Sequence, residues 1–235
     1  MTTSAAWWFF RAVWAGYLKR TLDTVPCEYF AARSELRTAY YGLAWNEAYD
    51  LVEFIAGLDL GSSRAPFVDG ADAILVCESA GYRLIDGQVA PLVAESEVAA
   101  IETAAGNTAC GGAAQHVRKA LVLLSQRPDP DLRNSVKESI SAVESAAKFI
   151  ANDDKADLSK ALKAVSDKIG MHGALEKGLL CIYGYTSDED GIRHGMVDEP
   201  KLTVADARFM LVACSAFVNY LIEKGLEAGL IPRTA

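Results

Sequence analysis

The sequence predicts a mainly helical protein that carries one β-hairpin. Two observations predict it: apolar residues recur at steps of three and four along most of the chain, and Asp86-Gly87 separates two short apolar runs. The first spacing is that of one face of an α-helix, and Asp-Gly supplies the positive φ angles of a tight primed turn. We therefore expect a small α+β N-terminal region over residues 1–108, followed by an antiparallel helical bundle over residues 109–235.

Composition narrows the class of protein. The chain has 235 residues, of which 51% are apolar, and its 31 acidic and 23 basic side chains give a net charge of -8. This apolar share can form a proper core and excludes a disordered tail protein. The negative charge argues against a protein that coats nucleic acid or anionic lipid, so any basic surface must be local. The five cysteines are odd in number and widely spaced without a Cys-x-x-Cys pair, which favours reduced thiols over disulfides or a zinc site.

The chain shows no targeting signal that we recognise. Its first residues lack the basic start and uninterrupted apolar core of a signal peptide. The longest nearly apolar run, residues 209–222, is shorter than the roughly 20 residues that a membrane span needs. We expect a cytoplasmic protein that does not enter a membrane.

In the N-terminal region the first helix is predicted by an aromatic stripe, which we interpret as internal packing or a subunit contact. A second helical region follows Pro26 and runs to about Leu58, because proline interrupts the first helix. Residues 61–72 are rich in glycine, serine and proline, and we predict a loop there. The aromatic residues of the stripe are Trp7, Phe10, Trp14 and Tyr17.

The C-terminal region reads as five helices. Asp157 is a natural N-cap for the third of them, and Thr203 with Asp206 approximates a capping box for the last. The five expected helices cover residues 113–125, 131–150, 157–169, 173–183 and 203–227.

The segment 183–195 is polar and contains several glycines. Of all the segments of the chain, it is the one whose residues are least explained by packing in a core. His194 could exchange a proton near neutral pH, and Arg193 could hold a phosphate through two parallel hydrogen bonds. If the segment is helical, Asp190 lies one turn before His194 and could orient its ring. The alternative is structural: Ser187 caps a short helix and Arg193 closes a salt bridge.

A second polar group lies on the predicted helix 131–150. Arg133 and Lys137 share one row and Asn134 and Glu138 an adjacent one, so we expect cation and carboxylate to face one groove; the alternative is ordinary solvent-facing charge. His116 and His172 are isolated in sequence from acids and cysteines at metal-ligand spacing. We interpret them as helix-terminal or interface residues, and we predict no metal site.

Several of these runs resemble a known family. Residues 131–144, 183–194 and 209–221 look like those of bacterial AbiJ-type proteins, in which an AbiJ N-terminal domain of the fourth class precedes a HEPN-like helical domain. Two upstream runs, residues 45–54 and 81–87, match the first of these domains in the same order. The resemblance covers about residues 45 to 225.

The resemblance implies a HEPN-like antiparallel bundle, a homodimer, and a role in abortive infection or a related antiviral or toxin–antitoxin system. It also implies RNA as substrate, cleaved without metal or other cofactor. Active ribonucleases of the HEPN superfamily carry an arginine followed, after four to six residues, by a histidine. Here the corresponding positions before His194 hold Ser187, Asp188 and Glu189, so the arginine would have to be Arg193 or Arg133.

The implied mechanism is attack of an RNA 2′-hydroxyl on its own phosphate. His194 would be the general base, and Arg193 or Arg133 would stabilise the charge that accumulates on phosphorus. The expected substrate-binding residues are Asn134, Lys137, Glu138 and Asp190. The alternative function is a HEPN-like module without catalysis, which binds a partner protein, a nucleotide or a nucleic acid end, or serves in assembly.

Overall fold

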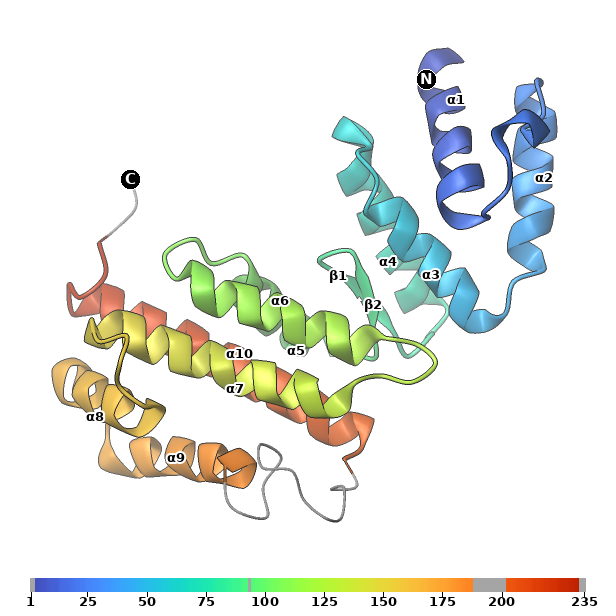
Figure 1. Ribbon diagram of the computed structural model, residues 1–235. Coiled ribbons are helices and arrows are strands. Elements are labelled where there is room, and N and C mark those ends of the chain that lie inside the picture. The colour runs from blue at the N-terminus through green and yellow to red at the C-terminus, as the bar shows by residue number, and fades with distance from the viewer. Residues whose placement is uncertain (1–2, 93, 188–201, 233–235) are drawn as a thin grey trace. The chain divides into compact units, whose positions relative to one another are not determined.

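The computed structural model describes residues 3–92, 94–187 and 202–232, and it divides into two compact units. The first unit is Met1–Cys77 and the second is Glu78–Ala235. Figure 1 shows that both are built from helices, with one two-stranded antiparallel hairpin. The predicted mainly helical class with a hairpin is confirmed for the described residues.

The first unit has a small aromatic core. Phe10 and Trp14 are buried, with ring centroids 6.4 Å apart in an edge-to-face arrangement, and Ala32 packs against them. The predicted aromatic stripe is therefore a packing face. The helices of this unit are α1 (Thr3–Ala12), which continues as a π-helical turn at Val13–Tyr17, α2 (Tyr29–Tyr41), α3 (Trp45–Ala56) and α4 (Arg64–Cys77), with short 3₁₀ turns at Leu22–Thr24 and Gly61–Ser63.

The loop predicted over residues 61–72 is wrong. Only Gly61–Ser63 forms a short turn, and α4 begins at Arg64. Pro66 lies in the first turn of α4, where a backbone N–H would have no partner within the helix, so the proline is tolerated there. None of the described residues of α4 is buried, although the helix is rich in apolar side chains.

The described residues of the second unit form the hairpin and six helices. Asp86 and Gly87 both have positive φ angles, 48° and 81°, which confirms the predicted turn. Leu84 pairs with Val89 across the hairpin. The elements are β1 (Arg83–Ile85), β2 (Gln88–Ala90), α5 (Glu95–Ala105), α6 (Gly111–Ser125), α7 (Leu132–Ala151), α8 (Leu158–Ile169), α9 (Gly173–Ser187) and α10 (Val204–Glu227).

The hairpin and α5 pack into the second unit. Asn219 of α10 donates a hydrogen bond to the Ala100 carbonyl of α5 at 2.9 Å, and Arg127 donates one to the Val89 carbonyl of β2 at 2.7 Å. The boundary between compact units therefore lies after Cys77, whereas the sequence led us to place a domain boundary after residue 108.

Helix α7 lies at the centre of this unit and packs against α6, α8 and α10. Figure 1 shows that α7 and α10 begin at the same end of the unit and that α9 runs in the opposite direction. Both predicted caps are confirmed: the Asp157 side chain accepts from the Lys160 N–H at 2.8 Å, and Thr203 and Asp206 form a capping box. These caps fix where α8 and α10 begin.

Among the described residues, α10 alone is long and apolar enough to cross a membrane. It extends beyond the apolar run noted in the sequence, and half of its most apolar stretch is buried inside the second unit. Residues such as Leu211 and Val218 are fully buried, so α10 has the character of a core helix.

Candidate functional site

Three of the seven predicted site residues, Asp190, Arg193 and His194, lie outside the described residues. The described chain stops at Ser187, the last residue of α9, and resumes at Leu202, just before α10. The other four predicted residues lie in the first half of α7.

The four α7 residues do not share one face. Glu138 contacts α6, as described below, whereas Ile140 lines a small cavity with side chains of α8, α9 and α10. Arg133 lies two helical turns before Ile140 and hence on that same side of α7. Arg133 and Glu138 are five residues apart, which corresponds to about 140° around a helix. The contacts of Glu138 with α6 therefore do not test whether the two side chains face one groove.

Asn134 and Lys137 have different surroundings. Asp131 is the N-cap of α7: its carboxylate accepts from the Asn134 backbone N–H at 3.0 Å and from the Asn134 side chain at 2.7 Å. Asn134 therefore helps to begin the helix, and its amide is already engaged. Lys137 is exposed on the ridge between the two sides of α7.

Glu138 is the most distinctive of the four, because it is a buried carboxylate with two basic neighbours. One carboxylate oxygen is 2.6 Å from His116 Nδ1 and the other accepts from Lys119 Nζ at 2.5 Å. The Glu138 side chain is 10% exposed, that of His116 39% and that of Lys119 61%. We call these three residues the α6–α7 cluster, since His116 and Lys119 lie on α6.

The electrostatics of the cluster favour an ionised Glu138. Burial raises the pKa of this carboxyl, but the hydrogen bonds and positive charge of Lys119 and His116 outweigh burial and leave the pKa below its ordinary value. Glu138 is thus an anion at neutral pH. Because an ionised carboxylate only accepts hydrogen bonds, Nδ1 of His116 is the donor in this contact, and Nε2 is the other ring nitrogen.

His116 was missed as a candidate because its acid is remote in the sequence. The interpretation of His116 as a residue isolated from acids is wrong in space, since Glu138 lies 22 positions later. The antiparallel pairing of α6 and α7 brings them together, as it brings Ser135 Oγ within 2.9 Å of the Ala120 carbonyl. The helical spacing of Glu138 and Lys137 gave no information on which helix each would face.

A cavity of about 440 Å³ lies where α9 ends and α10 begins. Of the described residues that line it, one is charged, and it is the carboxylate of Asp206. Asp206 accepts hydrogen bonds from the backbone and side chain of Thr203, which lower its pKa. The described walls of this cavity therefore offer no cation to a phosphate. Its lining residues are Cys181, Ile182, Asp206, Phe209 and Met210.

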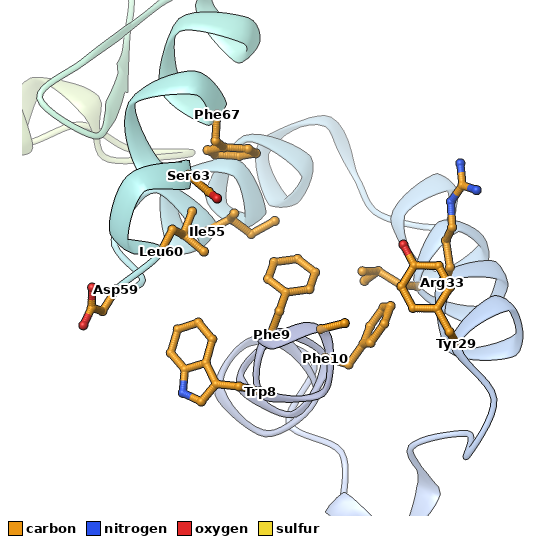
Figure 2. A pocket seen from close by; sticks show the side chains of 12 residues that line it. Trp8, Phe9, Phe10, Tyr29, Arg33, Ile55, Asp59, Leu60, Ser63 and Phe67 are labelled. Carbon is orange, nitrogen blue, oxygen red and sulfur yellow. The ribbon is translucent and has the colours of Figure 1, made fainter. Parts of the chain in front are cut away.

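The first unit contains a separate cavity of about 460 Å³, between α1, α2 and α3 with the start of α4. In Figure 2 the rings of Trp8 and Phe9 project from α1 toward Ile55 and Leu60, so the walls are mainly apolar. The guanidinium of Arg33 points away from this space. The cavity suits an apolar side chain better than a charged ligand.

The described residues contain no group of three or more His, Cys, Asp or Glu side chains that could hold a metal ion. The cysteines are free thiols, two of them buried, and burial raises the pKa of Cys214 to about 12. A thiol of this kind is an inert part of the core.

Comparison of the chain with protein-family models, with curated proteins and with solved structures finds no match.

Proposed function

We propose that this protein is an abortive-infection effector of the AbiJ type whose second unit is a HEPN-like bundle that cleaves RNA without a metal ion. The proposal follows from the resemblance of residues 131–144, 183–194 and 209–221 to that family. It includes a homodimer, because the two catalytic motifs of HEPN ribonucleases meet at a dimer interface.

One structural observation supports the site: the end of α9 and the start of α7 lie at the same end of the second unit (Figure 1). Ile140 of α7 and Tyr183 of α9 line one small cavity. At 1.5 Å per residue, Arg133 lies about 10 Å from Ile140 toward the N-terminus of α7. Ser187 lies about 6 Å from Tyr183 toward the C-terminus of α9. Because the two helices are antiparallel, both steps go toward the same end, where the segment holding Arg193 and His194 begins.

In the proposed reaction, His194 accepts the proton of an RNA 2′-hydroxyl, whose oxygen then attacks the adjacent phosphorus. Arg133 or Arg193 stabilises the charge that develops on the phosphoryl oxygens. The exposed ammonium of Lys137 attracts the phosphate backbone from the ridge of α7. Asp190 would orient the imidazole.

The test compares wild type, His194→Ala and Arg133→Ala on a single-stranded RNA in EDTA, with products identified by mass spectrometry. We expect fragments that end in a 2′,3′-cyclic phosphate, and a loss of at least about 100-fold in rate for His194→Ala. Lys163→Ala is the matched control, since Lys163 is an exposed cation on α8. Equal RNA cleavage and equal growth of expressing cells for wild type and His194→Ala would refute the proposal.

A second candidate function, assembly without catalysis, is favoured by the first unit. Phe30, Tyr41 and Trp45 are 77%, 72% and 58% exposed, and aromatic residues at this exposure are typical of contact surfaces. The expected contact role of Trp14 does not fit, because Trp14 is fully buried.

The exposed aromatics give the test of assembly. We expect Phe30→Ala with Trp45→Ala to shift the mass measured by light scattering from oligomer to monomer. The control is Ser34→Ala, another exposed position on α2. An unchanged mass in the double variant would exclude this surface as the contact.

A further inference from the structure

We propose that His116, in place of His194, is the general base for RNA cleavage in the second unit, with Glu138 as its positioning residue and Lys119 beside it. The inference rests on the proposed function for its substrate, an RNA phosphodiester. It assigns a proton-transfer role to the α6–α7 cluster, which the resemblance does not include.

The geometry of the pair is that of a carboxylate orienting an imidazole. Nδ1 of His116 is 2.6 Å from the Glu138 carboxylate. Because Glu138 belongs to another helix, this contact fixes the orientation of the ring at its Nδ1 side. Within the described part of the chain, no hydrogen bond to Nε2 of His116 is found. The imidazole is 39% exposed, so Nε2 is the ring nitrogen that a ligand could reach.

The burial of Glu138 distinguishes this arrangement from a surface ion pair. Glu138 is one-tenth exposed, and its second oxygen is already occupied by Lys119 at 2.5 Å. The carboxylate is therefore restricted in position and cannot swing away from the ring. An imidazole fixed on one side by an ionised carboxylate can take a proton on the other, because the carboxylate stabilises the imidazolium that forms.

Positive charge next to this base favours a phosphate ester as the ligand. The Lys119 ammonium lies one helical turn beyond His116, and it is 61% exposed although it donates to Glu138. On α7, Asn134 and Ser141 lie one helical turn to either side of Glu138, and Ser145 lies one turn further. These three side chains are neutral. A phosphate brought next to His116 therefore meets the exposed Lys119 ammonium and a carboxylate that already accepts two hydrogen bonds.

The proposed step conserves atoms and protons. Nε2 of His116 takes the proton of the 2′-hydroxyl as the 2′-oxygen forms a bond to phosphorus, and the bond from phosphorus to the 5′-oxygen breaks. The 5′-oxygen takes a proton from solvent, and the imidazolium returns its proton to solvent. The products are a 2′,3′-cyclic phosphate and a 5′-hydroxyl.

The decisive variant is His116→Asn, because the asparagine amide can still donate to Glu138 but has no second ring nitrogen. The probe is a single-stranded RNA labelled with a fluorophore and a quencher, cleaved in EDTA. We expect the rate to fall by about 100-fold or more. His172→Asn is the matched control: His172 Nδ1 accepts from the Ala174 N–H at 3.2 Å, a capping role that asparagine can fill.

A second variant separates positioning from structure. Glu138→Gln should lower the rate and move the acidic limb of the rate–pH profile to lower pH, since the imidazolium loses its negatively charged partner. A merely structural Glu138 would lower stability without moving this limb. If His116→Asn fails to fold, the rate–pH profile of Glu138→Gln still tests the inference. An acidic limb at the same pH as in wild type would then overturn it.

The outcomes separate the two proposals. If His116→Asn cleaves RNA as fast as wild type, the inference is overturned. The proposed function is then tested by His194→Ala alone. Loss of cleavage in His116→Asn with full activity in His172→Asn supports the inference, whatever His194→Ala does. RNA that stays intact with excess wild-type protein overturns both.

Discussion

Replacing Glu138 by alanine should destabilise the second unit, and the structure sets the size of the effect. Glu138 accepts two charge-assisted hydrogen bonds, each of which contributes roughly 1.5–3 kcal/mol where water is excluded. Their donors His116 and Lys119 are partly exposed, so after the substitution water can solvate them. The cost should therefore stay below the 3–5 kcal/mol typical of a fully buried pair. We expect about 1–3 kcal/mol.

The effect should depend on pH with a definite sign. The folded-state pKa of Glu138 lies below its ordinary value, so the unfolded chain binds the proton more readily. Its stabilisation is complete above the unfolded pKa, about 4.3, and is lost as the pH falls through the lower folded value. Wild type and Glu138→Ala should therefore differ most at pH 7 and converge in acid.

The assay is urea unfolding followed by circular dichroism at several pH values, with a thermal melt as a second measurement. A loss of 2 kcal/mol corresponds to a fall of about 4–8 °C in melting temperature for a unit of this size. Lys119→Ala and the double variant complete a double-mutant cycle, which should give a coupling energy above about 0.5 kcal/mol. Equal midpoints for wild type and Glu138→Ala at pH 7, or a difference that grows in acid, would refute the reasoning.

Three further predictions concern the core and caps of the second unit. Leu211→Ala should cost about 2–5 kcal/mol in urea unfolding because the side chain is fully buried in α10, and a loss under 1 kcal/mol would contradict this packing. Thr203→Ala should cost about 1 kcal/mol at pH 7 by removing the cap of α10, and less in acid, where protonation of Asp206 weakens the capping box in wild type too. Iodoacetamide should label the three exposed cysteines of the folded protein, whereas labelling of Cys110 and Cys214, detected by peptide mass spectrometry, should require denaturant.

Local features of the fold were predictable because their causes lie within a few residues. The Asp86-Gly87 turn requires positive φ angles, and the Thr203 cap requires a side-chain oxygen three residues before an acid. The failure at residues 61–72 is also local: the glycines and Pro66 suggested a loop, yet proline is compatible with the first turn of a helix.

The candidate site was less predictable because it depends on which helices pack together. Helical spacing correctly placed Arg133 and Glu138 on α7, but it could not say that Glu138 would pair with side chains of α6. The sequence singled out His194, which lies outside the described residues, and it treated His116 as an isolated ring. The pairing of His116 with Glu138 arises only from the antiparallel packing of α6 on α7.

The sequence by itself determined the helical class, the hairpin, the principal caps and the apolar faces of this protein. These follow from backbone sterics and from periodicities of a few residues. Tertiary structure alone decided that the hairpin belongs with the second unit, and that an acid 22 positions after His116 lies 2.6 Å from its ring. Such contacts depend on the register between whole helices, which is set by the fit of many side chains together and is not encoded in the spacing of any one segment.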